Sequence, residues 1–159
     1  MEIIYQPIGL IYSPFKSLED MPIQPMSDVS GSGTVELFPQ FIEGLKDLEG
    51  FSHIYLIYYF HKIHYPTLTV FPLLDMEPRG IFATRAPSRP NPIGLSLVKL
   101  ISLENNLIYV EQLDILDRTP LLDIKPYIPS FENPQNIRIG WLENTLGDDR
   151  THLSDKRLE

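Results

Sequence analysis

Prolines constrain this chain more than any other feature of its sequence. The 159 residues include 15 prolines but only nine glycines, and many of the prolines stand at the ends of apolar stretches. Because proline fixes φ and lacks an N–H donor, it ends helices and is confined to turns and to the ends or edges of strands. The sequence therefore predicts short strands separated by stiff turns and argues against long helices.

Several apolar stretches between the prolines are candidates for these strands. Hydrophobic residues make up 43% of the chain, which is enough for one core, so we expect one domain. Eight short strands favour an all-β fold in which the sheet curls into a small barrel. The expected strands are Ile3–Tyr12, Gly33–Leu37, His53–Phe60, Leu68–Phe71, Gly80–Thr84, Leu95–Ser102, Leu107–Leu116 and Leu121–Ile124.

The remaining segments predict one helix, one long loop and a tail. A helix is expected from Pro39 to about Leu48, because proline suits the first helical position and apolar residues recur there at helical spacing. The stretch Ser17–Ser32 has no periodicity and is expected to be a mobile loop that covers a site. We expect the barrel domain to cover residues 1–142 and residues 143–159 to form a polar tail.

The stretch His53–Phe60 predicts how the chain assembles. It is apolar on both faces instead of alternating, so both faces should be covered. A small barrel covers one face by itself, and the other face then needs a helix or a second subunit. We expect a homodimer.

Charge and composition exclude several classes of protein. A formal net charge of −8 argues against a surface that binds nucleic acid everywhere, because such binding needs clustered Lys and Arg. There are no cysteines, and His61 and His64 have no carboxylate nearby, so we expect no metal site. No apolar run is long enough to span a bilayer and no leader is evident, which favours a soluble, cytoplasmic protein with no membrane partner.

One segment concentrates positive charge. Between Arg79 and Lys99 there is no Asp or Glu, and Arg85 and Arg89 lie in a proline-braced stretch together with Asn91. Guanidinium groups suit carboxylates or phosphates, and an asparagine amide can both donate to and accept from a purine edge. The same residues also fit a braced turn with solvated arginines, and residue types alone leave both interpretations open.

A second segment carries three polar side chains in a row. Asp123, Lys125 and Tyr127 alternate with apolar residues, so they share one face of an extended strand. A carboxylate, an ammonium and a phenol together could bind a zwitterion or supply acid and base groups to a reaction. A solvent-facing strand with a weak ion pair is the alternative.

Both segments resemble one known family. The run Arg-Pro-Asn-Pro-Ile-Gly-Leu-Ser at Arg89–Ser96 and the run Leu-Asp-Ile-Lys-Pro-Tyr at Leu122–Tyr127 closely resemble signatures of the TsaA-like, or TrmO, family of tRNA methyltransferases. The resemblance covers about Ile8 to Pro129. It implies a β-barrel that dimerises, binds S-adenosylmethionine, and transfers its methyl group to N6 of threonylcarbamoyladenosine at position 37 of tRNA.

The resemblance implies the positions of the cofactor pocket, and the chemistry of the side chains suggests their roles. Phe15 and Phe60 would sandwich the adenine, and Arg85 would hold the methionine carboxylate. For catalysis our own candidates are Asp123 or Tyr127, which would remove the N6 proton, while the remaining candidates would orient the substrate. The cofactor set implied by the resemblance is Pro14, Phe15, Lys16, Phe60, His61, Arg85, Leu95, Asp117, Arg118, Thr119 and Pro120, and our catalytic candidates are Asp123, Tyr127, Lys125, Arg89 and Asn91.

Two alternatives stay open at this point. The family commonly has Asp-Gly-Thr-Pro where this chain has Arg118 in the second position, which changes a cofactor-binding turn. The chain could therefore methylate another RNA or a small molecule, or it could be a regulatory module that senses S-adenosylmethionine. If the basic residues from Arg79 to Lys99 form one positive face, nucleic acid is favoured, whereas internal ion pairs favour the sensor.

Overall fold

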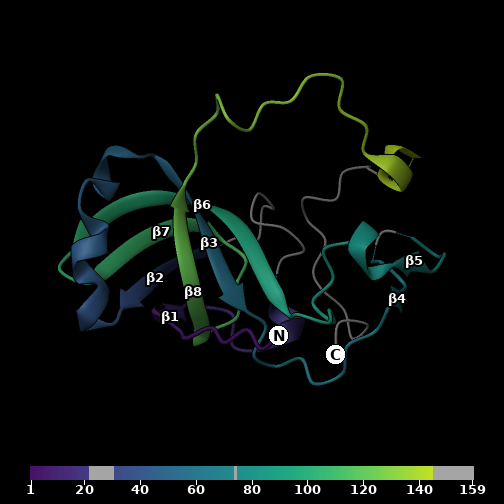
Figure 1. The fold of residues 1–159 in the computed structure, drawn as a ribbon, viewed down its shortest axis with the longest axis horizontal. Helices are drawn as coiled ribbons and strands as arrows, with labels where there is room; N and C mark the ends of the chain where they lie inside the picture. Colours follow the sequence, from purple (N-terminus) through teal and green to yellow (C-terminus); the bar gives the residue numbers. More distant parts are fainter. Residues whose placement is uncertain (22–30, 74, 145–159) are drawn as a thin grey trace.

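The computed structural model describes residues 1–21, 31–73 and 75–144. Its ordered elements are strands and short 3₁₀ helices (Figure 1). The strands are β1 Gly9–Tyr12, β2 Gly31–Leu37, β3 His53–Tyr59, β4 Thr69–Val70, β5 Arg79–Gly80, β6 Ile93–Glu104, β7 Leu107–Leu113 and β8 Thr119–Pro126. The 3₁₀ helices are η1 Leu18–Asp20, η2 Pro39–Leu45, η3 Leu48–Gly50, η4 Ile81–Ala83 and η5 Gly140–Asn144.

The sheet closes into an antiparallel barrel in the order β1-β2-β7-β6-β3-β8, with β8 pairing back onto β1. This confirms the all-β barrel expected from the sequence. The strands β4 and β5 pair with each other beside the barrel, and η4 follows β5 directly (Figure 1).

Some expected elements differ from the observed ones. The first strand begins at Gly9 instead of Ile3, because pairing with β2 and β8 starts there. The short helix expected from Pro39 is confirmed as η2, but it is a 3₁₀ helix that ends at Leu45 instead of about Leu48, and Asp47 in the left-handed region (φ 67°) separates it from η3. The expected strand Gly80–Thr84 is wrong, since its middle forms η4.

Other boundaries shift without changing the type of element. The strand expected at Leu95–Ser102 extends over the whole of β6, because pairing with β3 and β7 continues beyond both ends. Of the expected loop Ser17–Ser32, three residues form η1 and the last two belong to β2. Residues 22–30 of that loop and 145–159 of the expected tail lie outside the described residues.

The barrel core is filled by side chains that alternate inward along each strand. In β3, Ile54, Leu56 and Tyr58 are buried, whereas Tyr55 and Ile57 between them are only partly covered. The sequence suggested cover on both faces of this strand; within one chain, the barrel core covers one face and leaves the outer face partly exposed.

A β-bulge in β8 decides which of its side chains face outward. Ile57 pairs with Asp123 but Tyr58 pairs with Leu121, so Leu122 is an extra residue on β8. Strict alternation from buried Leu121 would place Asp123 inside the barrel. The extra residue reverses the alternation, so Ile124 packs against the core and Asp123 faces outward.

Gly94 leaves room for a buried ring. It pairs with Tyr58 across β3 and β6, and a Cβ placed on it would overlap the ring atoms Cε2 and Cζ of Tyr58. The ring could not remain in its place beside any larger residue.

We expect Gly94→Ala to lower the free energy of unfolding by about 1–3 kcal/mol, because the added methyl displaces the Tyr58 ring inside a packed core. Urea denaturation measures the change. The matched control is Gly44→Ala, where a Cβ meets nothing within 4 Å, and stability should stay the same or rise slightly. Equal stability of both variants would contradict the packing argument.

Candidate functional site

The ends of β1 and β3 meet the beginnings of β6 and β8 at one end of the barrel, as the pairs Ile11↔Thr119 and Tyr59↔Ile93 require. The loops that leave these strand ends surround this opening. We call the region formed by residues 12–18, 60–65, 84–92 and 114–119 the mouth. It unites segments that lie up to about a hundred residues apart in the chain, as the Ser13–Asp117 contact shows.

Asp117 joins two loops of the mouth. Its Oδ1 accepts a 3.0 Å hydrogen bond from the backbone N–H of Ser13, and its Oδ2 lies 2.7 Å from Nζ of Lys16. Its own backbone N–H donates to the carbonyl of Phe15 at 2.8 Å. Burial raises the pKa of Asp117, but Lys16 and the Ser13 amide outweigh it and hold the pKa below its usual value.

Thr119 connects the same region to the loop that follows β3. Its hydroxyl donates to the carbonyl of Leu116 at 2.7 Å and lies 3.3 Å from Nδ1 of His61. The hydroxyl proton is used by that carbonyl, so Nδ1 of His61 is the donor in this contact. Burial, followed by the charge of Lys62, lowers the pKa of His61, which favours the neutral ring.

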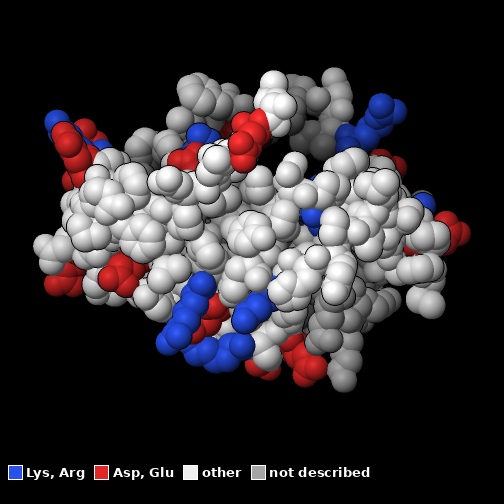
Figure 2. All heavy atoms as spheres, turned by 60° about the horizontal axis from the view of Figure 1, so that its bottom comes forward, with Lys and Arg blue, Asp and Glu red and all other residues white. Residues whose placement is uncertain are grey.

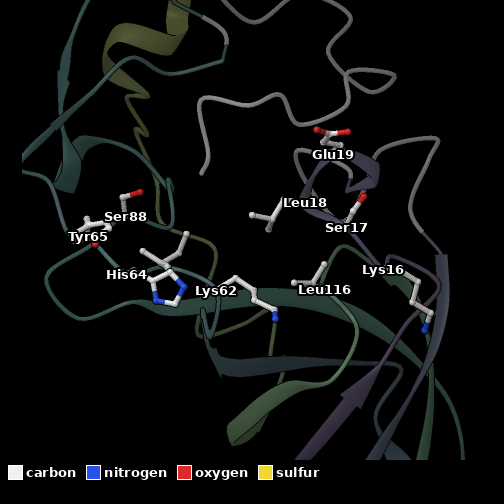
Figure 3. Close-up of a pocket in the computed structure, with 10 residues that line it drawn as sticks. Lys16, Ser17, Leu18, Glu19, Lys62, His64, Tyr65, Ser88 and Leu116 are labelled. Atoms are coloured by element: carbon white, nitrogen blue, oxygen red, sulfur yellow. The ribbon is translucent and has the colours of Figure 1, made fainter.

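A cleft of about 560 Å³ opens at the mouth, within the size range of small-molecule sites. Figure 3 shows His64, Tyr65 and Ser88 on one side of it and Lys16 and Ser17 on the other. Lys62 and Leu116 also line the cleft, and neither was predicted from the sequence.

The two phenylalanines expected to sandwich an adenine differ in exposure. Phe15 is only 8% exposed and supports its loop from inside, while Phe60 is partly exposed and packs edge-on against Tyr58 with ring centroids 5.3 Å apart. Pro14 is exposed beside Phe15, and Pro120 pairs with Leu10 of β1 at the start of β8.

A chain of polar groups that sequence reasoning missed lies at the mouth, with Tyr58 and Ser96 buried and Asp114 partly exposed. Ser96 donates to Oδ1 of Asp114 at 2.6 Å, and the Tyr58 hydroxyl lies 3.0 Å from Oγ of Ser96. Burial raises the pKa of Asp114 to about 6, and burial followed by the charge of Asp114 also raises the pKa of Tyr58. Ser96 is the last residue of the first signature, so its position was a usable signal, whereas Asp114 lies before the second signature at Leu122–Tyr127.

The row predicted on one strand face is observed on the outer wall of the barrel. Asp123 and Lys125 form an ion pair of 3.0 Å, and Tyr127 packs edge-on against Tyr55 at 6.0 Å. The Tyr55 hydroxyl donates to Glu132, and this bond, with burial, raises the pKa of Tyr55 to about 12. The outer-wall row is therefore separate from the cleft at the mouth.

The proline-braced loop uses one of its arginines for its own structure. Nη1 of Arg89 donates to the carbonyls of Ile81, Thr84 and Ala86 at 3.1, 2.8 and 3.3 Å. Asn91 lies exposed in the same loop. Leu95 is 50% exposed and points outward from β6, so only its backbone could serve the mouth.

The basic residues of this segment do not form one positive face. Arg79 donates to Asp75 through Nε at 2.8 Å, and Lys99 lies 3.3 Å from Glu111. Arg85 is exposed and makes no ion pair or hydrogen bond within the described residues. Figure 2 shows basic side chains together at the lower edge of one face, with acidic atoms between them and a broad uncharged centre.

The described residues lack both a metal-ligand cluster and a membrane-spanning helix. Across residues 1–21, 31–73 and 75–144, no three His, Asp or Glu side chains gather as metal ligands would. Over the same ranges, no helix has the length and hydrophobicity needed to cross a membrane.

Comparisons with known proteins agree with the resemblance seen in the sequence. Residues 10–133 match the family model described as the tRNA-methyltransferase O N-terminal domain. A probable S-adenosyl-L-methionine-binding protein of Pyrococcus abyssi is 55% identical over 144 residues, which cover 91% of this chain and 78% of that protein.

Longer proteins share the same region. The tRNA (adenine(37)-N6)-methyltransferase of Mus musculus is 35% identical over 144 residues, which cover 86% of this chain and 33% of that enzyme. The crystal structure of TrmO from Pseudomonas aeruginosa has a TM-score of 0.74 at 38% identity and covers 88% of this chain. This chain spans only 62% of that solved chain.

We expect Asp117→Asn to lower the free energy of unfolding by about 1–3 kcal/mol at neutral pH, because it removes the charge that Lys16 and the Ser13 amide bind. The difference should shrink as the pH falls below about 4, where the wild-type carboxylate also takes up a proton. Urea denaturation across pH measures both effects.

The matched control is Asp123→Asn, which breaks an exposed ion pair and should cost less than about 1 kcal/mol. Equal losses in the two variants would show that Asp117 does not join the loops of the mouth.

Proposed function

This chain belongs to the tRNA-methyltransferase O N-terminal domain family, and on that premise we propose that it is an S-adenosylmethionine-dependent methyltransferase acting on N6 of threonylcarbamoyladenosine at position 37 of tRNA. The observation that carries the proposal is the mouth. Three residues of the expected cofactor set, Lys16, Asp117 and Thr119, lie there. Lys16 forms an ion pair with Asp117, and Thr119 contacts His61, so the loops that carry them meet beside the cleft.

The residues at the mouth fit the cofactor chemically. The partly exposed ring of Phe60 offers a face for adenine, and exposed Arg85 has a free guanidinium for the methionine carboxylate. The cleft of about 560 Å³ is large enough for a nucleoside with an amino-acid tail. When bound, S-adenosylmethionine supplies an activated methyl group on a sulfonium.

The chain's own task in the reaction is to orient the adenosine and to accept a proton. Methyl transfer breaks the bond from carbon to sulfur while the N6 lone pair forms the new bond, so alignment supplies much of the rate. An acylated N6 is a weak nucleophile, and removing its proton makes it stronger. Asp123 or Tyr127 would take this proton, with Lys125 and Asn91 orienting the substrate. Because these residues do not line the cleft, this role requires the bound adenosine to extend from the cleft to the outer wall.

Positive charge around the mouth supports a tRNA substrate. Lys16 and Arg118 are both more than two-thirds exposed, and Lys62 lines the cleft between them and the braced loop. These cations stand where phosphates of a bound RNA strand would pass. Asp117 offsets part of this charge, in agreement with local rather than general RNA binding.

We also propose a homodimer in the cytoplasm, where its tRNA substrate is found. The outer faces of β3 and β6 support the dimer, because Tyr59, Ile93 and Leu95 are 40%, 37% and 50% exposed on neighbouring strands. Such a surface is typical of one that a second copy covers.

One observation favours the alternative of a sensor of S-adenosylmethionine. Arg79 and Lys99 are held in ion pairs, which removes them from a shared nucleic-acid surface. A sensor would bind the cofactor without transferring its methyl group, so an activity assay separates the two functions.

We expect the purified protein to transfer labelled methyl groups to tRNA that carries threonylcarbamoyladenosine, with a new methylated nucleoside seen by mass analysis. Lys125→Met should lower kcat about 10- to 100-fold, because Lys125 orients the adenosine of the tRNA substrate. The Kd for S-adenosylmethionine should stay the same, because Lys125 does not belong to the expected cofactor set. The matched control Lys99→Met removes another outward, ion-paired lysine and should leave kcat unchanged. Cofactor binding without transfer to any tRNA would replace the enzyme by the sensor.

We expect Arg118→Gly to weaken tRNA binding and reduce its salt dependence by about one phosphate contact. Arg118 occupies the left-handed region at φ 59°, where glycine is less strained, so stability should stay the same or rise. Titration of labelled tRNA at several salt concentrations measures the change. Lys46→Ala, at the opposite end of the barrel, is the control; equal weakening by both variants would exclude a specific role for Arg118.

A further inference from the structure

The polar chain at the mouth ends on a carboxylate. Ser96 gives its hydroxyl proton to Asp114 at 2.6 Å, so the Tyr58 hydroxyl, 3.0 Å away, is the donor to Ser96. Tyr58 and Ser96 are buried, whereas Asp114 is partly exposed. The hydrogen bonds therefore run from Tyr58 through Ser96 to a carboxylate that a ligand can still reach.

Asp114 has no cationic partner. Within the described residues, no Lys, Arg or His forms an ion pair with it. Arg85 lies near enough to lower the pKa of Asp114, but burial dominates and raises that pKa to about 6. A carboxylate that is largely desolvated and lacks a counter-ion is costly, unless a cation arrives with a ligand.

Arg85 is the cation near Asp114. Its guanidinium forms no ion pair within the described residues, and its charge lowers the pKa of both Asp114 and Tyr58. Tyr58 in turn packs against Phe60, the ring expected beside the adenine. A cation and an anion that lie near each other without forming an ion pair match the two ends of an amino-acid zwitterion.

We propose that Asp114 binds the α-ammonium group of S-adenosylmethionine while Arg85 binds its carboxylate, so that the two residues recognise the amino-acid end of the cofactor. This assignment rests on the proposed function, which supplies the cofactor. Ser96 and Tyr58 are positioning residues that hold the Asp114 carboxylate toward the mouth.

The pairing makes cofactor binding depend on pH. The groups that face Asp114 are Tyr58 from β3, Ser96 from β6 and Arg85 from the loop before β6. Burial raises the pKa of Tyr58 further above its usual value, whereas it raises the pKa of Asp114 to about 6, which brings that carboxyl group close to the neutral range. Affinity for an ammonium should fall as the pH is lowered through about 6, where Asp114 takes up a proton.

The test uses three ligands that differ in one group each. S-adenosylmethionine has the sulfonium and the amino-acid end, S-adenosylhomocysteine lacks the sulfonium charge, and 5′-methylthioadenosine lacks the amino-acid end. Calorimetric Kd values for Asp114→Asn should rise about 10- to 100-fold for the first two ligands and stay the same for the third. Asparagine keeps an acceptor for Ser96, and Glu111→Gln on the outer surface is the control that removes the same charge.

Each other outcome overturns the assignment. Equal loss for all three ligands means a structural role, and loss confined to S-adenosylmethionine means that Asp114 faces the sulfonium. No loss at all excludes contact. Between about pH 5 and about pH 7.5, wild-type affinity should rise and that of Asp114→Asn should stay flat, whereas a slope kept by the variant shows that another group causes the pH dependence. Wild-type protein that binds none of the ligands overturns the proposed function itself.

Discussion

The pairing of β8 with β1 is the constraint on which the rest of this structure depends. It joins the last strand of the barrel to the first and leaves the closed sheet without an edge. The same pairing places Thr119 beside Ile11, so the loop that ends β1 and the loop that begins β8 must meet. The contacts of Asp117 with Ser13 and Lys16 follow from this closure, and so does the cleft beside them.

Closure alone would place every second residue of β8 inside the barrel. The bulge at Leu122 changes this, since it lets Thr119 and Leu121 fill the core while Asp123 and Lys125 face outward. Because of this extra residue, the beginning of β8 borders the mouth, and the polar side chains at its end face outward and form the outer wall. A polar row and an apolar core can then share eight residues of chain.

The two carboxylates of the mouth differ in how their charge is balanced. Asp117 has Lys16 and a backbone amide as partners, and its ionised form stabilises the junction of two loops. Asp114 accepts a hydrogen bond from the Ser96 hydroxyl but forms no ion pair within the described residues, and burial works against its charge. Residues of the chain itself therefore balance the charge of Asp117, whereas Asp114 gains its counter-ion from the ligand that we propose.

The sequence by itself determined the barrel class, through its prolines and short apolar stretches, and it determined that Asp123, Lys125 and Tyr127 share a face, because side-chain alternation is a local property. It also led to the family through Arg89–Ser96 and Leu122–Tyr127. It placed the start of the helix at Pro39 but not its end, because a left-handed Asp47 separates η2 from η3 before Leu48. Only the tertiary structure decided that Asp114 meets Ser96, that Asp117 meets Lys16, and that Arg89 serves its own loop, because these partners are fixed by strand register and loop path, which no local pattern encodes.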